Sequence, residues 1–120
     1  MRPTILVADD DSAILEVMTI VLEGEGHDVV IAKDEEEIFV RLNDSLPRLI
    51  LLDIGLGGSD GREVTKRLKS AEYTRQIPVV ISSANSDTAK IADEIGADGF
   101  LSKPFEIDEL LRIVNTHISS

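Results

Sequence analysis

Carboxylates stand directly after two apolar runs of the sequence, where they could do chemistry together. Asp9 and Asp10 follow the run at residues 5–8, and Asp53 ends the run at residues 49–52. In open α/β sheets the carboxyl ends of buried strands carry the chemistry. Several negative charges brought together are unfavourable unless a cation or a proton occupies the cluster. The pattern therefore indicates a site for a hard divalent metal and, through it, phosphate chemistry.

The size and composition of the chain limit what it can be. With 120 residues, of which 42% are hydrophobic, it suits one domain with a single core, which we assign to residues 1–120. It has no cysteine, so disulfides, thiol catalysis and zinc-thiolate sites are excluded. The apolar runs are far shorter than the ~20 residues that cross a bilayer, and no signal peptide is visible. These features predict a cytoplasmic protein without a membrane partner.

The net charge of the chain is −11 at pH 7. Phosphate contacts with DNA or RNA need clustered lysine and arginine, so this charge predicts no direct nucleic-acid binding. Solubility alone accounts for the dispersed acidic residues. It does not account for acidic residues gathered at the end of a predicted strand.

Five short apolar runs alternate with amphipathic segments along the chain. Most of the runs are nearly continuous in hydrophobicity, which is typical of parallel strands covered on both faces. The segments between them carry apolar residues at helical spacing. The predicted strands lie at residues 5–8, 29–32, 49–52, 79–81 and 100–101. A strand–helix order repeated five times indicates a doubly wound α/β sandwich.

Local signals place several helix ends. Asp34 and Glu37 have capping-box spacing at the start of the second helix, and Asp60 opens the third. Ser86 is the expected N-cap of the fourth helix, and Gly96 is its expected stop.

The strands of a parallel sheet all end at the same edge, so the residues that follow them meet there. The residues placed around this one crevice are Asp9, Asp10, Asp53, Ser82, Ser83, Ser102 and Lys103. The second strand ends in residues that offer less chemistry, which predicts that it lies at an edge of the sheet. The crevice then combines carboxylates, hydroxyls and an ammonium group.

Several short pieces of the sequence, in this order, are similar to the receiver domains of two-component response regulators. The pieces are Ile5-Leu-Val-Ala-Asp9-Asp10-Asp11, Leu51-Leu52-Asp53, Asp60-Gly61, Pro78-Val-Val-Ile-Ser-Ser83-Ala84, Gly96-Ala97-Asp98 and Phe100-Leu-Ser-Lys103-Pro104-Phe105. No single piece is specific, but their order and spacing are, and the resemblance covers essentially the whole chain. It implies a flavodoxin-like three-layer sandwich around a five-stranded parallel sheet of order 2-1-3-4-5.

The resemblance implies that Asp53 is the phosphoacceptor, whose carboxylate oxygen attacks a phosphorus in line to form an acyl phosphate. It also implies bound Mg²⁺, which prefers oxygen ligands and keeps several waters. Asp10 is the expected direct ligand and Asp9 acts mainly through water, while Asp53 and the carbonyl of Gly55 complete the site. Asp11 is expected at the start of the first helix, where the dipole favours an acid. Helix capping or a turn is the alternative role for the aspartates.

Other residues match the family's catalytic and switch positions. Ser83 would donate a hydrogen bond to the phosphoryl group, or else bond a neighbouring loop. Lys103 would place its ammonium against Asp53, and the peptide bond before Pro104 is expected to be cis. Phe100 is either an aromatic switch or ordinary core packing. Phosphorylation would shift the population between two packings of the surface.

The same resemblance implies a role in phosphorelay signal transduction, with no catalysis beyond the chain's own phosphorylation and dephosphorylation. The phosphoryl donor would be a histidine kinase or a histidine phosphotransfer protein. A downstream protein partner would bind the face formed by the fourth helix, the fifth strand and the fifth helix, and a homodimer stays open.

Some features depart from the family's usual pattern. Gly55 has no side chain to shield an acyl phosphate from water, and Asn85 is short and polar. These positions, two residues after Asp53 and Ser83, tune phosphoryl lifetime in the family. The interval from Ser83 to Lys103 is about two residues shorter than the family's pattern, which predicts a change in the loop before the fourth helix or in its first turn.

Other functions stay open from the sequence. A magnesium-dependent phosphatase of the haloacid dehalogenase type also uses an aspartate after a buried strand, but it needs Asp-x-Asp followed by threonine, and a cap domain. A flavin or nucleotide carrier would use the glycines of residues 55–58, which are weak evidence alone. A receiver-like interaction module that is never phosphorylated would keep the fold without the chemistry.

Overall fold

The computed structural model of the protein describes residues 3–118, which form one five-stranded parallel sheet covered by helices. The strands are β1 (Thr4–Ala8), β2 (Asp28–Ala32), β3 (Leu49–Asp53), β4 (Val79–Ser83) and β5 (Gly99–Ser102). Their order in the sheet is β2-β1-β3-β4-β5, so the predicted order is confirmed and β2 lies at an edge. Residues 1–2 and 119–120 of the predicted domain lie outside the described residues.

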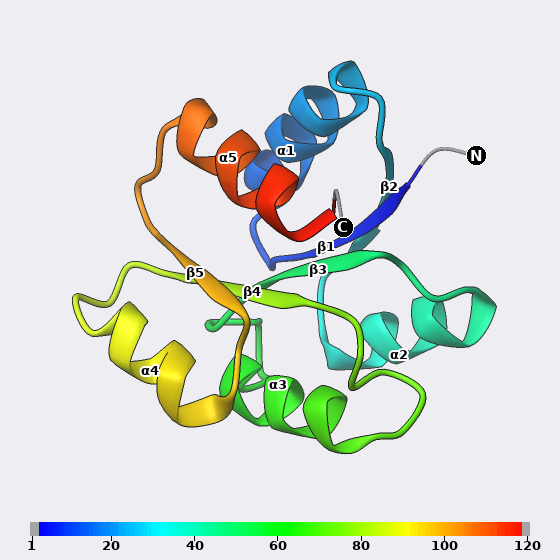
Figure 1. Cartoon of the computed structure of the whole chain (residues 1–120), viewed down its shortest axis with the longest axis vertical. Helices are drawn as coiled ribbons and strands as arrows, with labels where there is room; N and C mark the ends of the chain where they lie inside the picture. The colour runs from blue at the N-terminus through cyan, green and yellow to red at the C-terminus, as the bar shows by residue number, and fades with distance from the viewer. Residues whose placement is uncertain (1–2, 119–120) are drawn as a thin grey trace.

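Five helices cover the two faces of this sheet. They are α1 (Ser12–Gly24), α2 (Glu35–Asp44), α3 (Gly61–Ser70), α4 (Thr88–Ile95) and α5 (Ile107–Ile118). Helices α1 and α5 lie on one face, and α2, α3 and α4 lie on the other (Figure 1). This is the predicted doubly wound three-layer sandwich. No helix among the described residues is long and apolar enough to cross a membrane.

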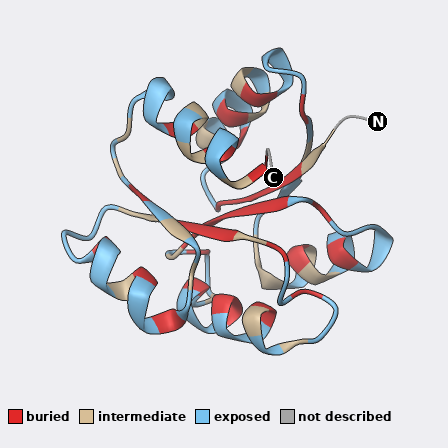
Figure 2. Ribbon diagram, viewed as in Figure 1, coloured by how far each residue is buried: buried red, intermediate tan, exposed pale blue. Residues whose placement is uncertain are grey.

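The central strand β3 is buried along its whole length (Figure 2). Because side chains alternate across a strand, Ile50 and Leu52 belong to the core beneath α2, α3 and α4, whereas Leu49 and Leu51 belong to the core beneath α1 and α5. Asp53 is the last residue of this strand, so both cores hold the backbone that carries its carboxylate.

Three of the predicted helix ends are confirmed. The side chain of Asp34 accepts a hydrogen bond from the backbone N–H of Glu37 at 2.9 Å, and Asp60 caps α3 by accepting from the N–H of Arg62 at 2.9 Å. Gly96 ends α4 with a φ of 79°, a left-handed conformation that favours glycine.

The predicted N-cap at Ser86 is wrong. Helix α4 begins at Thr88, and Asp87 stands at the cap position without a side-chain cap bond. The hydroxyl of Thr88 instead donates to the carbonyl of Asn85 at 2.5 Å, and the Asn85 side chain accepts from the N–H of Asp87 at 2.8 Å. The loop is therefore closed by Asn85 and by the buried Thr88, so a serine cap is not needed.

Candidate functional site

Strands β1, β3 and β5 bring two carboxylates and an ammonium together at one edge of the sheet. Asp9 follows β1 directly, Asp53 ends β3, and Lys103 follows β5. Ala8 is in register with Leu52, so Asp9 and Asp53 stand side by side on neighbouring strands. Asp9 is only 3% exposed and Asp53 only 7% exposed, which is unusual for aspartate and calls for a charged partner.

Lys103 is that partner for both aspartates. Its Nζ donates to Oδ2 of Asp9 at 2.9 Å and lies 3.2 Å from Oδ1 of Asp53. The backbone N–H of Lys103 donates to the carbonyl of Ser83 at 2.8 Å, which ties it to the end of β4. The peptide bond before Pro104 is cis, as the sequence predicted. The ammonium is thus held between the two buried carboxylates.

Asp10 adds a third carboxylate from the solvent side of this cluster. Carboxylate oxygens of Asp9, Asp10 and Asp53 all lie within 4.8 Å of one another. One ammonium faces three carboxylates, so the ionised cluster has an excess of two negative charges, which suits a hard divalent cation such as Mg²⁺. Both oxygens of Asp9 already accept hydrogen bonds, from Lys103 and from the N–H of Asp11 at 3.0 Å. This favours Asp10 and Asp53 as the more available ligands.

The surroundings of Asp53 oppose its ionisation. Burial raises the pKa of the Asp53 carboxyl above its ordinary value, and the negative charges of Asp9 and Asp10 raise it further. The ammonium of Lys103 and its hydrogen bond lower it, but the net pKa shift is upward. A group that could neutralise Asp9 and Asp10 would therefore favour the anionic, nucleophilic form of Asp53.

The pKa of Lys103 shifts the opposite way from what burial alone would give. Burial lowers it, but the hydrogen bond to Asp9 and the negative charge of Asp53 outweigh burial and raise the pKa above its ordinary value. Lys103 therefore stays positively charged at neutral pH and fixes a positive charge at the end of β5.

The loop after β3 places a glycine beside the carboxylate of Asp53. A Cβ atom added at Gly55 would lie 3.7 Å from Oδ2 of Asp53, with no other contact within 4 Å. The next residue, Leu56, is only 2% exposed and anchors the loop in the core. Gly58 then turns the chain with a φ of 76°. Oδ2 therefore faces the open Gly55 side, whereas Oδ1 faces Lys103.

Ser83 is half-buried at the end of β4, in register with Ser102 at the end of β5. Its hydroxyl oxygen accepts a hydrogen bond from the backbone N–H of Asn85 at 3.0 Å. A hydroxyl that accepts in this way still has its hydrogen to donate. The observed bond is the loop contact that was the alternative for this serine, and it is compatible with donation to a phosphoryl group.

Phe100 lies on β5 beside Ile81 of β4, and its side chain is 41% exposed. It borders a shallow cavity of about 230 Å³ together with Arg112 and Ile113 of α5. Ordinary core packing does not describe this side chain. Its role as a switch stays a prediction.

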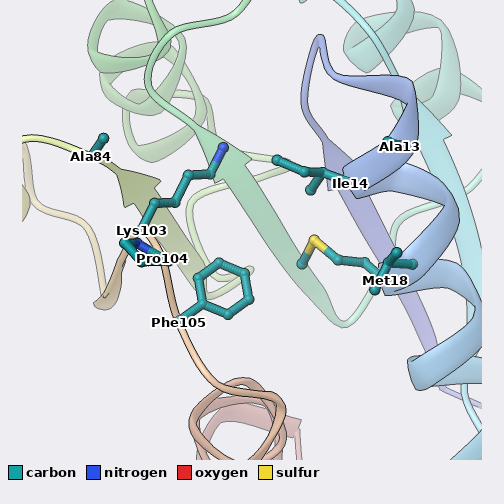
Figure 3. Close-up of a pocket in the computed structure, with 8 residues that line it drawn as sticks. Ala13, Ile14, Met18, Ala84, Lys103, Pro104 and Phe105 are labelled. Carbon is teal, nitrogen blue, oxygen red and sulfur yellow. The ribbon is translucent and has the colours of Figure 1, made fainter.

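An apolar groove of about 490 Å³ adjoins the cluster on the α1 side. Ile14 and Met18 of α1 point across it toward Phe105 and Lys103, as Figure 3 shows. Val17 on its rim is 54% exposed. The sequence did not reveal this groove, because it forms between α1 and the segment that follows β5.

Sequence reasoning also assigned no role to Asp98, which directly precedes β5 at the end of the sheet where the strands begin. Its Oδ2 accepts from the N–H of Val79 at 2.8 Å and from Nζ of Lys69 at 2.8 Å. The same Nζ donates to the carbonyls of Arg75 and Ile77. This cluster joins α3 to the starts of β4 and β5 and has a structural role.

A model of the response regulator receiver domain matches residues 5–115. The chain belongs to this family. It is 36% identical over 120 residues to the DNA-binding response regulator MtrA of Mycobacterium tuberculosis, covering 98% of this chain and 51% of MtrA. It is 39% identical over 113 residues to the phosphate regulon transcriptional regulatory protein PhoB of Escherichia coli, covering 92% of this chain and 49% of PhoB.

Solved structures agree with this assignment. The crystal structure of a putative response regulator from Chloroflexus aurantiacus has a TM-score of 0.92 and 30% identity, and the match covers 100% of both chains. The predicted family and fold are thus confirmed. Receiver domains of response regulators generally act as signal transducers, and this chain has their acidic cluster.

The prediction of no direct nucleic-acid binding is wrong. MtrA is named as a DNA-binding response regulator, and the chain spans about half the length of the curated relatives it matches. The net charge of −11 describes only the 120 residues given. The net charge of a receiver therefore cannot predict whether a longer protein of this kind binds DNA through another segment.

Proposed function

We propose that the receiver accepts a phosphoryl group on Asp53 in a magnesium-dependent reaction, changes its surface in response, and loses the group by hydrolysis. The observation that carries this proposal is the ammonium of Lys103, held 2.9 Å from Asp9 and 3.2 Å from Asp53. It places a fixed positive charge beside a carboxylate whose other oxygen lies next to Gly55, which has no side chain to cover it.

In the proposed step, Oδ2 of Asp53 attacks the phosphorus of the donor in line. A P–O bond forms as the P–N bond to the donor's phosphohistidine breaks, and the departing imidazole nitrogen keeps the electron pair and takes up a proton. Oδ1 keeps its contact with Lys103. The ammonium of Lys103 also stabilises the negative charge of the phosphoryl oxygens. The donor class is a histidine kinase or a histidine phosphotransfer protein.

The residues at the cluster fit a magnesium ion. Asp10 and Asp53 would hold it directly, Asp9 mainly through water, and Gly55 through its carbonyl. When bound, the ion neutralises the clustered charge and polarises a phosphoryl oxygen. The observation that supports the fit is the set of three carboxylates within 4.8 Å, opposed by a single ammonium.

The response follows from the added charge. An acyl phosphate gives the site a second negative charge and new acceptor oxygens. The hydroxyl of Ser83 can donate to one of them while it still accepts from Asn85. Movement of β4 would then alter the packing beside Phe100 on β5. In a longer protein built like MtrA, this change would act on a DNA-binding segment.

Incubation of the purified chain with Mg²⁺ and acetyl phosphate, followed by intact mass measurement, tests the proposal. The wild type should gain one phosphoryl group, and the gain should vanish with EDTA and in Asp53→Asn. The variant Asp93→Asn, on the exposed side of α4, is a matched control that should react normally. No gain in the wild type would leave an interaction module that is never phosphorylated, and an equal gain in Asp53→Asn would show that the acceptor is another residue.

A further inference from the structure

The first residue of α3 packs directly on the backbone that follows the predicted phosphoacceptor. The N–H of Gly61 donates to the carbonyl of Ile54 at 2.8 Å. The N–H of Ile54 donates in turn to the carbonyl of Ser82 on β4 at 3.0 Å. Residue 54, next to Asp53 in the chain, is therefore held between β4 on one side and α3 on the other.

There is no space for a side chain at Gly61. A Cβ atom at this position would lie 2.6 Å from the carbonyl oxygen of Asp53 and 2.7 Å from Cα of Ile54. Both are backbone atoms, which cannot swing away as the end of a side chain can. The φ of Gly61 is not positive, so this position needs glycine for space and not for backbone conformation.

An added Cβ would force a movement of about 0.8 Å, since ordinary contacts of this kind begin near 3.4 Å. Helix α3 is poorly placed to absorb it. Val64, Thr65 and Leu68 on its inner face are all 0% exposed, and the hydroxyl of Thr65 donates to the carbonyl of Gly61 at 2.9 Å. The register between β3 and β4 ends at Asp53, and beyond it the peptide of residue 54 is joined to β4 by its bond to Ser82, so a shift here moves the backbone that follows Asp53.

We propose that Gly61 is a positioning residue for Asp53: its missing side chain lets α3 approach the peptide after Asp53 and so sets the carboxylate against Lys103. The proposal rests on the proposed function, since it concerns the geometry of the phosphoacceptor. Asp60 caps α3, and Gly61 defines how near that helix lies to the site.

The test compares Gly61→Ala with Gly24→Ala, at the last residue of α1, where a Cβ would meet nothing within 4 Å. Two quantities are measured: the rate constant for phosphorylation by acetyl phosphate with Mg²⁺, and the NMR resonances of the Asp53 carboxyl carbon and the Lys103 side chain without metal. In Gly61→Ala the rate constant should fall 10- to 100-fold, because misplacement by about 1 Å can cost ~100-fold, and both resonances should shift. In Gly24→Ala neither should change.

A purely structural role gives a different result. Gly61→Ala would then lower the melting temperature but leave the Asp53 and Lys103 resonances and the rate constant of the folded protein unchanged, and this outcome would overturn the proposal. If Gly61→Ala does not fold, Thr65→Val decides. It replaces the hydroxyl that holds the Gly61 carbonyl by a methyl group, so it should move the same resonances by less, and unmoved resonances count against the proposal.

The resonances separate this proposal from the proposed function. If the wild type takes up no phosphoryl group, the proposed function fails, while the metal-free spectra of Gly61→Ala still show whether Gly61 positions Asp53. If the wild type reacts and Gly61→Ala reacts equally fast with unmoved resonances, only the positioning role fails.

Discussion

Replacing Asp53 by asparagine should stabilise the metal-free protein at neutral pH. The pKa of Asp53 is raised in the folded state, mainly by burial and then by the charge of Asp9. The unfolded chain therefore ionises this group at lower pH than the folded chain does. The wild type loses stability as the pH rises from the ordinary pKa of 3.8 through the higher folded-state pKa, and the loss is complete above it. Asp53→Asn has no such loss.

The size of the effect follows from opposing interactions. At an effective dielectric constant of about 20, the attraction to Lys103 at 3.2 Å is about 5 kcal/mol. The repulsion from a carboxylate oxygen of Asp9 within 4.8 Å is at least about 3 kcal/mol. Asp10 is exposed and screened by water, so at a dielectric constant of about 80 it adds about 1 kcal/mol. These terms nearly cancel, so burial decides the sign. We expect a gain of about 1–2 kcal/mol in the free energy of unfolding, or roughly 3–8 °C in melting temperature.

Thermal and urea unfolding followed by circular dichroism in EDTA measures this gain. Asp93→Asn controls for the removal of one charge from an acidic chain, and it should be close to the wild type. The gain in Asp53→Asn should be full at pH 7. It should be absent near pH 3, where Asp53 of the wild type is largely protonated in both the folded and the unfolded state. A variant that is less stable than the wild type at pH 7, or equally stabilised at pH 3, contradicts this account of Asp53.

Magnesium should reverse the order of the two proteins. A ligand that binds only the folded state, present at about one hundred times its Kd, stabilises by about 2.7 kcal/mol, which exceeds the expected difference of about 1–2 kcal/mol. The wild type should gain this amount from Mg²⁺, whereas Asp53→Asn has lost a ligand and should gain much less. An equal response in both proteins would show that Asp53 does not take part in the metal site.

Lys103→Met should raise the pKa of Asp53 further, because the ammonium lowers it; an NMR pH titration of the Asp53 carboxyl carbon measures this, and an unchanged or lower pKa contradicts it. Gly55→Leu should slow phosphoryl loss several-fold, because the new side chain excludes water from Oδ2 of Asp53, which lies 3.7 Å from the added Cβ. Timed mass spectrometry after removal of the phosphoryl donor measures the rate of loss. A rate equal to that of the wild type refutes the prediction. Lys69→Met should cost about 1–3 kcal/mol in urea unfolding, because it removes the ammonium that donates to Asp98 and to the carbonyls of Arg75 and Ile77. Phosphorylation should be unchanged. A stability equal to the wild type would refute the structural role of Lys69.

The sequence was most informative where a signal is local. Continuous apolar runs mark strands that are covered on both faces, and β3 shows the reason, since every one of its residues is buried. Caps at Asp34 and Asp60 were predictable because each side chain bonds an N–H two or three residues further along the chain. The cluster of Asp9, Asp10 and Asp53 was predictable because parallel strands end at one edge.

Features that depend on distance between elements were not predictable. Sharing of Lys103 between Asp9 and Asp53 is set by the register of three strands, and the groove beside it by the packing of α1. The failed cap at Ser86 has a different cause, because the bonds that replace it lie within one short loop. A cap signal assumes that the helix must satisfy its own first N–H groups, but here Asn85 and the loop around it close the helix start.

The contacts of Lys103 also explain how an added charge at Asp53 could change the packing of side chains at the surface. The ammonium of Lys103 contacts Asp53, while its backbone N–H is bonded to the carbonyl of Ser83 on β4. A phosphoryl group on Asp53 would attract the ammonium and the Ser83 hydroxyl at once. Both residues belong to the same β4–β5 pair, in which Phe100 lies exposed beside Ile81. Added charge at the end of β3 would therefore act on β4 and β5 together, which is why the exposed side of this strand pair is where the proposed response should appear.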